Sequence, residues 1–399
     1  MNKYIILLSF DQSLGGAQIR YLSLFKEITQ RKNDYLLVIN SQLYDIAIKA
    51  DLINAEVQNI IILDKYLIIL ESPQKSSLKS ATKNKIKNNY FFRKISKLRN
   101  QLISLKKLIK YAYKLHKVFK STQPDYVYAI WTGGMIAWPL KYFYRFKLVY
   151  SYMDSGFSSI YNGLDNPLKN ERLALKKSDV IDFLSNDLFL GVSRRITLNK
   201  RTKIAISPCS FKNYNNLYPV YPKANAVTFC SRMTHIKNPL LLLASIVNFN
   251  KLTEDFGVIT FQFIGDGESV EQMKLFKEKN QLSNVEILGN IENPCKYLQR
   301  SKIFVSIQQS NNYPSQSLLE AMACGNAIIA SDVGETRKLV TENEGVLVKL
   351  DANNIAAALL YLIENNEECI SLGKNARAKV LKEHTIDNYL EYFYSLETK

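Results

Sequence analysis

Short apolar runs alternate with longer amphipathic stretches along almost the whole chain, and this alternation constrains the fold more than any other feature of the sequence. Each run is only a few residues long, which suits a buried strand better than a buried helix. Short apolar strands separated by helices predict parallel sheets that are covered on both faces. The predicted strands form two series: Tyr4–Ser9, Tyr35–Ile39, Tyr126–Ile130, Lys147–Tyr152, Val180–Leu184 and Lys203–Ile206, then Ala226–Cys230, Ile259–Ile264, Val285–Leu288, Ile303–Ile307, Ala327–Ala330 and Val346–Val348.

Two such series in 399 residues predict two Rossmann-like domains, because a single hydrophobic core rarely grows beyond roughly 250–300 residues. Residues 213–225 are rich in Asn and Tyr and contain two prolines, so we interpret them as a linker. We therefore expect an N-terminal domain over residues 1–215 and a C-terminal domain over residues 223–383. Residues 384–399 carry aromatic side chains at helical spacing and predict a final helix.

The excess of basic residues, which gives a net charge of +17, belongs to the first half of the chain. Residues 72–124 contain 15 Lys and Arg and no Asp or Glu, whereas residues 201–399 hold 21 of each sign. One interpretation is an amphipathic helix with a solvated basic face. The other is attachment to an anionic membrane surface, with the cations at lipid head groups. No nucleic-acid motif accompanies the charges, so a nucleic-acid partner is not expected.

Cysteine and histidine usage bears on the compartment and on metal binding. The five cysteines are scattered and lack C-x-x-C spacing, and there are only three histidines. This pattern favours a reducing compartment and argues against a zinc site or a disulfide framework. No apolar run reaches the ~20 residues needed to span a bilayer. We expect a cytoplasmic protein, at most peripheral to the inner face of a membrane, without a metal or a cofactor.

Residues 310–334 carry the strongest chemical signal. After a polar loop, Ser315 is placed to cap a short helix over Gln316–Cys324, which Gly325 ends before the next apolar strand. The first N–H groups of a helix lack partners and carry partial positive charge, so they favour a phosphate. Glu320 lies one turn into the helix, where a carboxylate can accept hydrogen bonds from ribose hydroxyls. This combination indicates nucleotide-sugar binding.

Two cations follow the first strand of the second series. Arg232 and Lys237 leave its carboxyl end, where open α/β sheets bind ligands. A guanidinium and an ammonium at this spacing can share one diphosphate. The alternative is a solvated loop with ordinary surface charges. His235 lies between the two cations and is interpreted as a bystander.

Glycines follow several other predicted strands. Gly15 and Gly16 precede a helix near the N-terminus, and Gly265 and Gly289 follow two strands of the second series. Each allows the backbone to approach a nucleotide closely, and each is equally compatible with a tight turn. None belongs to a G-x-G-x-x-G segment, which makes an NAD oxidoreductase the weakest alternative.

The order of these segments resembles the GT-B glycosyltransferases of family 4, a retaining, nucleotide-sugar-dependent group. The family pattern runs from a Gly-Gly loop through an Arg…Lys pair, a G-x-G turn, a V-x-x-x-G loop and an E-x7-E segment to an A-x-G-x-P-V-I-A strand. The matching segments are Gly15-Gly16, Arg232…Lys237, Gly265-Asp266-Gly267, Val285…Gly289 and Asn312…Glu320, followed by residues 323–330. The second half matches more closely than the first.

The resemblance implies a GT-B fold: two Rossmann-like domains facing a cleft, with the C-terminal helix crossing back to the first domain. It implies metal-independent transfer of a sugar from a nucleotide-diphosphate donor with retention of configuration. Arg232 and Lys237 would neutralise the leaving diphosphate, and Glu320 would hold the ribose. The residues that the resemblance assigns to donor binding are Gly15, Gly16, Gly265, Gly289, Ile291, Ser317, Leu318 and Glu320; those assigned to catalysis are Arg232, Lys237, Asp154 and Asn312.

Two positions depart from the family pattern. Asn312 replaces the first Glu of the E-x7-E pair, where the family residue would contact the donor sugar. Met153 stands where the family often has a histidine, and the adjacent Asp154 either takes part in the site or caps the next turn.

The sequence therefore predicts a hexosyltransferase-type glycosyltransferase that acts on a glycan or a lipid-linked acceptor, with bacterial surface polysaccharide such as lipopolysaccharide or capsule as the expected product. A sugar-nucleotide epimerase on the same fold is the enzymatic alternative. A non-catalytic partner that binds a nucleotide sugar is the other alternative, motivated by Asn312 and Met153.

Overall fold

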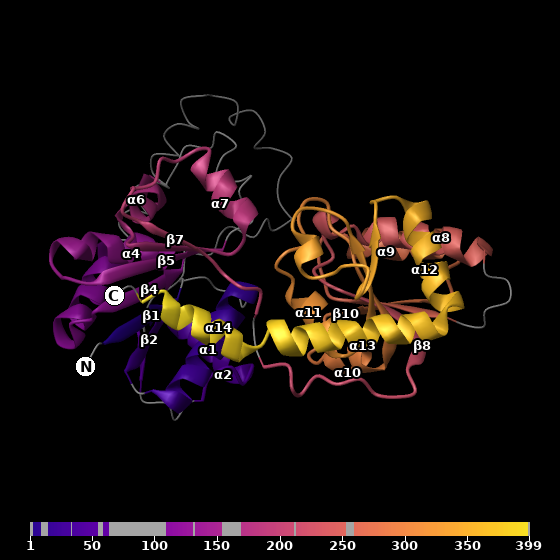
Figure 1. The fold of residues 1–399 in the computed structure, drawn as a ribbon, viewed down its shortest axis with the longest axis horizontal. Helices are drawn as coiled ribbons and strands as arrows, with labels where there is room; N and C mark the ends of the chain where they lie inside the picture. The colour runs from indigo at the N-terminus through magenta and orange to yellow at the C-terminus, as the bar shows by residue number, and fades with distance from the viewer. Residues whose placement is uncertain are drawn as a thin grey trace, which may run out of the picture. The chain divides into compact units, whose positions relative to one another are not determined.

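The structure, a computed structural model, describes residues 3–8, 15–32, 34–54, 59–63, 109–130, 132–153, 169–210, 213–252 and 259–397. Contacts along the chain define two compact units. The first comprises Met1–Ile206 together with Tyr394–Lys399, and the second comprises Ser207–Phe393. Each unit is built on its own parallel sheet (Figure 1).

The first unit contains a seven-stranded parallel sheet in the order β3-β2-β1-β4-β5-β6-β7. Six of these strands follow the predicted runs to within two residues, whereas the short strand β3 was not predicted. The strands are β1 (Tyr4–Leu7), β2 (Tyr35–Ile39), β3 (Ile60–Ile62), β4 (Tyr126–Ile130), β5 (Lys147–Tyr152), β6 (Val180–Phe183) and β7 (Lys203–Ile206).

Helices connect these strands in the first unit. They are α1 (Gly16–Arg31), α2 (Ser41–Lys49), a helix over residues 109–122, α4 (Thr132–Ala137), the 3₁₀ helix η1 (Trp138–Tyr142), α6 (Lys169–Lys177) and α7 (Asn186–Ser193). The helix over 109–122 buries Leu115 and Phe119 against side chains of the central strands, including Val127 of β4. Its basic residues face outward, as an amphipathic helix requires.

The second unit contains a six-stranded parallel sheet in the order β10-β9-β8-β11-β12-β13, the strand order of a dinucleotide-binding fold. Its strands are β8 (Ala224–Cys230), β9 (Thr260–Ile264), β10 (Val285–Gly289), β11 (Ser301–Ser306), β12 (Ala327–Ser331) and β13 (Gly345–Val348). Its helices are η2 (His235–Lys237), α8 (Pro239–Leu252), α9 (Val270–Lys279), α10 (Cys295–Arg300), α11 (Gln316–Ala323), η3 (Thr336–Lys338), α12 (Ala352–Glu364) and α13 (Asn366–Glu383). The last helix, α14 (Ile386–Ser395), begins in the second unit and ends in the first.

Helices cover both faces of this second sheet, as Figure 1 shows: α8, α9 and α12 lie on one face, and α10, α11 and α13 on the other. Successive side chains of a strand point to opposite faces. Ile303 and Val305 of β11 accordingly join the core under α8, whereas Phe304 joins the core under α11. Burial on both faces is why the middle of β11, Ile303–Val305, is a continuous apolar run.

The boundary between the units lies at Ile206 and Ser207, earlier than the expected end of the first domain at residue 215. Cys209 and Tyr214 are buried in the core of the second unit. The Ser210 hydroxyl donates to the main-chain oxygen of His384 at 2.6 Å. These apolar and polar contacts, which the Asn- and Tyr-rich composition conceals, place the segment with the second unit.

The end of the chain belongs to the first unit from Tyr394 onward. The Glu397 carboxylate accepts hydrogen bonds from the hydroxyls of Tyr4, Tyr35 and Tyr128 at 3.0, 2.7 and 3.2 Å. Burial and the neighbouring carboxylate raise the pKa of Tyr35, so its hydroxyl remains a donor. Within the ranges that the structure describes, no helix is long and apolar enough to cross a membrane.

Candidate functional site

The candidate site lies in the second unit, where the order of its strands reverses. Strands β8 and β11 are neighbours at the centre of the sheet. Strands β9 and β10 follow on the side of β8, and strands β12 and β13 follow on the side of β11. The loops that leave the carboxyl ends of these two strands therefore border a crevice, which is where open α/β sheets bind ligands. Arg232 and Lys237 follow β8, and Asn312 and α11 follow β11.

The loop after β8 is held by close backbone contacts with the turn after β9. The Met233 N–H donates to the Asp266 carbonyl at 2.9 Å, and the Ser269 N–H donates to the Met233 carbonyl at 2.9 Å. Gly265 has φ +129°, and a Cβ there would lie 1.9 Å from the Ser231 carbonyl oxygen. The structure thus explains Gly265 by packing within the protein, whereas the sequence interpretation assigns it to the donor.

Lys237 is a half-buried cation. It ends η2, and Asn238 turns the chain in the left-handed region at φ +54°. The Lys237 ammonium donates to the Gln308 amide oxygen at 2.6 Å. Burial lowers the pKa of Lys237 to about 8, and the Arg232 charge acts in the same direction. Two like charges that are brought together in this way are stabilised by an anion between them.

Gln308 and Asn312 form a chain of hydrogen bonds behind Lys237. The Gln308 side-chain N–H donates to the Asn312 amide oxygen at 2.5 Å, and the Asn312 side-chain N–H donates to the Ser306 carbonyl at 2.8 Å. The Ser306 carbonyl can only accept, so it fixes the orientation of both amides. As a result, the Gln308 oxygen points to Lys237.

Asn312 is 0 % exposed, and its amide is occupied by Ser306 and Gln308. The Asn312 side chain therefore lies inside the protein in this structure, and its expected contact with the donor sugar stays a prediction. We interpret Asn312 as the residue that positions Gln308. Sequence analysis missed Gln308, although a polar residue directly after a buried parallel strand is a signal for a ligand site.

The helix after β11 presents its N-terminus at the same crevice. It spans Gln316–Ala323, one residue shorter than expected, and Ser315 occupies the N-cap position. The Ser315 side chain makes no capping hydrogen bond, contrary to expectation, so the N–H groups of residues such as Ser317 and Leu318 are not satisfied by that cap. An uncapped N-terminus of this kind favours an anion.

Glu320 is 7 % exposed, and its carboxylate accepts a hydrogen bond from the Gln316 side chain at 3.0 Å. Burial raises the pKa of Cys230, the last residue of β8, to about 12, and the nearby Glu320 charge adds to this shift. Glu320 therefore lies close to the end of β8, beside the segment that carries Arg232.

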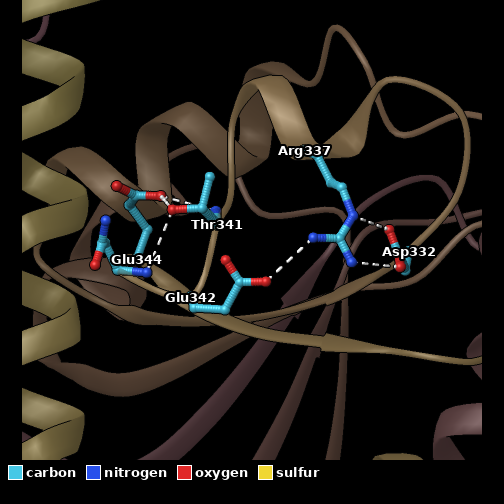
Figure 2. A network of polar contacts seen from close by, with 6 residues as sticks. Asp332, Arg337, Thr341, Glu342 and Glu344 are labelled. Carbon is cyan, nitrogen blue, oxygen red and sulfur yellow. Dashed lines mark hydrogen bonds and ion pairs between the residues drawn. The ribbon is translucent and has the colours of Figure 1, made fainter.

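A network of polar contacts braces the loop after β12 (Figure 2). Arg337 donates two hydrogen bonds to the Asp332 carboxylate, at 2.9 and 2.8 Å, and a third to Glu342 at 3.1 Å. In the same loop, the Glu344 carboxylate accepts from the Thr341 N–H and hydroxyl at 2.8 and 2.9 Å. A bidentate pair of this kind fixes the loop more strongly than a single ion pair does.

This braced loop also supports the segment before α11. The Asn311 side-chain oxygen accepts from the N–H groups of Glu335 and Tyr313 at 3.1 and 3.0 Å. Gly334 has φ +52°, and a Cβ there would lie 2.7 Å from the Asn311 side chain. Close packing of Asn311 against Gly334 therefore joins the loops that follow β11 and β12.

The remaining predicted residues are distributed as follows. Gly289 ends β10 at φ +69°, its carbonyl accepts from the Gly265 N–H at 2.7 Å, and Ile291 follows two residues later. Gly15 and Gly16 lie in the first unit at the start of α1, where the Gly15 N–H donates to the Gln18 side chain at 3.0 Å.

Two expectations concern residues outside those that the structure describes. Asp154 is one of them; its neighbour Met153 is 6 % exposed and follows β5. Residues 72–108 of the basic segment also lie outside the described ranges, and the remainder begins with the helix over 109–122.

The two parallel sheets define the class of protein. Solved structures with the same fold include sucrose-phosphate synthase from Thermosynechococcus elongatus, with a TM-score of 0.68 and 17% identity over 99% of this chain and 98% of that one. Another is Anabaena Alr3699/HepE in complex with UDP-glucose, with a TM-score of 0.70 and 15% identity over 98% of both chains. The fold is GT-B.

The sequence family agrees with this fold. Residues 212–379 match the family described as Glycosyl transferases group 1. A relative from Campylobacter jejuni, named GalNAc-alpha-(1->4)-GalNAc-alpha-(1->3)-diNAcBac-PP-undecaprenol alpha-1,4-N-acetyl-D-galactosaminyltransferase, is 29% identical over 42% of this chain and 46% of its own length. Residues 212–379 therefore match the group 1 glycosyltransferases, and the fold of the chain is GT-B.

Two further relatives extend the comparison. The N,N'-diacetylbacillosaminyl-diphospho-undecaprenol alpha-1,3-N-acetylgalactosaminyltransferase of Campylobacter jejuni is 25% identical over 69% of this chain and 77% of its own length. The poly(ribitol-phosphate) alpha-N-acetylglucosaminyltransferase of Staphylococcus aureus is 26% identical over 35% of this chain and 29% of its own. The matched part of the chain thus spans less than half the length of most of these relatives.

Proposed function

We propose that the protein transfers a sugar from a nucleotide-diphosphate donor to a glycan or a lipid-linked acceptor. The observation that carries this proposal is the position of Lys237 and Arg232 in the loop after β8, next to the strand β11, whose following helix α11 has an uncapped N-terminus. These groups suit a diphosphate, because they combine two cations with main-chain donors. Glu320, close to the end of β8, is suited to the ribose hydroxyls.

The chemistry follows from these charges. When the glycosidic bond of the donor breaks, negative charge develops on the leaving diphosphate, and fixed cations and helix N–H groups stabilise it without reorganisation. Lys237 has a pKa of about 8 before ligand binds, so an anionic ligand favours its protonated form. In this proposal, neutralisation of the diphosphate needs no metal ion, the sugar is a hexose, and its configuration is retained.

The acceptor is proposed from the relatives. The names of two of them specify undecaprenol-linked glycans, and a third name specifies poly(ribitol-phosphate). We propose that this protein likewise builds a bacterial surface polysaccharide. Because a lipid-linked acceptor is bound to a membrane, the proposal includes attachment of the protein to the inner face of the cytoplasmic membrane.

Such attachment is assigned to the basic segment over residues 72–124. In its described part, Ile109 and Tyr113 of the helix over 109–122 are 60 % and 59 % exposed, beside several lysines. Apolar and aromatic side chains that alternate with cations suit the interface of an anionic bilayer. This support is independent of the donor site.

The first experiment is a thermal-shift screen of the full chain with UDP, GDP, ADP and their sugar conjugates. A donor nucleotide raises the melting temperature because it binds only the folded protein. Lys237→Ala is expected to lose this shift, whereas Lys274→Ala, an exposed lysine on α9, retains it. If no nucleotide stabilises the wild type, or if Lys237→Ala responds equally, the assigned site is wrong.

The second experiment measures turnover. The stabilising donor is incubated with and without undecaprenol-linked or polysaccharide acceptors. Transfer that depends on an acceptor supports the proposal. Conversion of the donor alone to an epimer would identify the epimerase alternative, and tight binding without any conversion would identify a non-catalytic partner.

A further inference from the structure

A cavity lies in the first unit, away from the carboxyl ends of its strands. Its volume is 340 Å³, and its lining includes Trp138, Lys141, Lys176, Lys177, Asp179 and Arg201. Lys176, Lys177 and Asp179 directly precede β6, Arg201 precedes β7, and Trp138 and Lys141 belong to η1, which comes before β5. The cavity therefore lies at the amino ends of the strands. Ligands of open α/β folds bind at the opposite edge, and the cavity is therefore separate from the ligand edge of this sheet.

The charge of the cavity is positive. Its one carboxylate, Asp179, accepts from the Lys141 ammonium at 2.5 Å and from the Leu148 N–H at 2.7 Å. Lys141 also donates to the Lys177 carbonyl at 2.9 Å, which fixes it in place. Across the described ranges, no carboxylate forms an ion pair with Lys176, Lys177 or Arg201. These three cations are thus available to one anionic ligand.

Exposed aromatic side chains form the rim of the cavity. Tyr142, which lines it, and the adjacent Phe143 are 71 % and 74 % exposed. The Lys177 ammonium lies 5.8 Å from the centre of the Tyr142 ring, and the Trp138 and Tyr142 rings are 6.2 Å apart. Exposed aromatic rings beside cations suit the boundary between lipid head groups and acyl chains.

The rim continues onto the helix over residues 109–122. The Phe143 and His116 rings are 6.4 Å apart, and the Lys117 ammonium lies 5.0 Å from the centre of the exposed Tyr113 ring. The cavity and the exposed face of this helix therefore form one surface of aromatic and basic side chains. A soluble phosphate would need the cations but would gain nothing from this aromatic extension.

We propose that this cavity binds the phosphate head group of an anionic glycerophospholipid, while Tyr142 and Phe143 enter the membrane interface. Lys176, Lys177 and Arg201 would surround the phosphate, and Trp138 would close one side. The inference rests on the membrane attachment in the proposed function, which it extends from the basic segment to a defined lipid site. It is independent of the donor site in the second unit.

The test uses the full chain and sedimentation with vesicles of phosphatidylcholine, either alone or with one third phosphatidylglycerol. The wild type is expected to bind only the anionic vesicles. The triple variant Lys176→Ala, Lys177→Ala, Arg201→Ala is expected to partition at least about tenfold more weakly, because each cation near an anionic surface contributes to binding. The double variant Tyr142→Ser, Phe143→Ser is expected to weaken binding without changing the net charge.

A matched control separates the site from the overall charge. The triple variant Lys274→Ala, Lys279→Ala, Lys374→Ala removes the same charge from exposed positions of the second unit and should bind as the wild type does. If both triple variants lose binding equally, net charge explains the attachment and the lipid site is refuted. It is also refuted if the cavity variants bind vesicles normally while inorganic phosphate stabilises only proteins with an intact cavity, a result that would assign a soluble phosphate.

The same preparations separate this inference from the proposed function. If the wild type binds no anionic vesicles, both the lipid site and the membrane attachment are wrong, whereas nucleotide stabilisation still tests the transferase. If the wild type binds vesicles and the cavity variants bind equally well, only the lipid site is wrong. Without ligand, the cavity variants should melt at the temperature of the wild type, which shows that they are folded, and they should keep any nucleotide-induced shift that the wild type has.

Discussion

The Lys237 ammonium donates a hydrogen bond of 2.6 Å to the amide oxygen of Gln308, which is a neutral partner. A carboxylate at this position would orient the cation but would also offset its charge. The amide orients it and leaves the charge to the ligand. The partner of Gln308 is Asn312, the residue that departs from the family pattern, so both residues serve the same cation.

The first prediction concerns proton uptake on nucleotide binding. At pH 8, about half of the Lys237 side chains are protonated in the free protein, because the pKa is about 8. A bound diphosphate raises this pKa, so binding should take up as much as about half a proton and should weaken as the pH rises above 8. Calorimetry in two buffers of different ionisation enthalpy measures the uptake. Lys237→Arg, with a permanent charge, should bind without uptake.

The second prediction separates the two ways of changing Gln308. Gln308→Glu should raise the pKa of Lys237 and weaken nucleoside-diphosphate binding roughly tenfold by offsetting its charge. Gln308→Leu removes the acceptor and should move the midpoint of the pH profile of binding to lower pH. The Kd measured from pH 6 to pH 10 distinguishes them. A residue with only a structural role would leave both midpoints where they are in the wild type.

The third prediction concerns the buried amide of Asn312. Asn312→Ala leaves Gln308 and Ser306 without their partner, so the free energy of unfolding should fall by about 1–3 kcal/mol. Denaturant unfolding measures the loss. Asn343→Ala, at an exposed position in the braced loop, is the control and should change stability by less than about 0.5 kcal/mol. Equal stability of the two variants would contradict the buried role.

The fourth prediction compares two glycines with positive φ. Gly265→Ala would place a Cβ 1.9 Å from the Ser231 carbonyl and should displace the loop that carries Arg232. At Gly289, nothing lies within 4 Å of a Cβ, so Gly289→Ala should cost only the ~1–2 kcal/mol of left-handed backbone. Unfolding and nucleotide affinity are measured for both. Nucleotide affinity should fall only for Gly265→Ala.

Much of the fold could be predicted because its signals are local. Strands such as β8 and β11 are buried on both faces, which makes their sequences apolar and easy to find. The short strand β3 was missed because three residues carry no period that distinguishes a strand from a turn. The segment around Tyr214 has the composition of a linker because its polar residues hide two buried ones, Tyr214 and Leu217.

The site was predictable only in part. The placement of Arg232, Lys237 and Glu320 at strand and helix ends follows from residue type and spacing, whereas their roles in donor binding stay predictions. The role of Asn312 does not, because the side-chain direction depends on the Ser306 carbonyl, which no sequence pattern specifies. Gln308 was missed for the same reason.

The pairing of Glu397 with three tyrosines has a consequence for dissecting the molecule. The first unit takes residues from both ends of the chain, so the second unit is a continuous insertion within it. A fragment that stops at Ile206 would lack the carboxylate that Tyr4, Tyr35 and Tyr128 share. A fragment of the second unit that stops at Phe393 would cut helix α14, and a fragment of the first unit needs its two chain segments joined by an added linker.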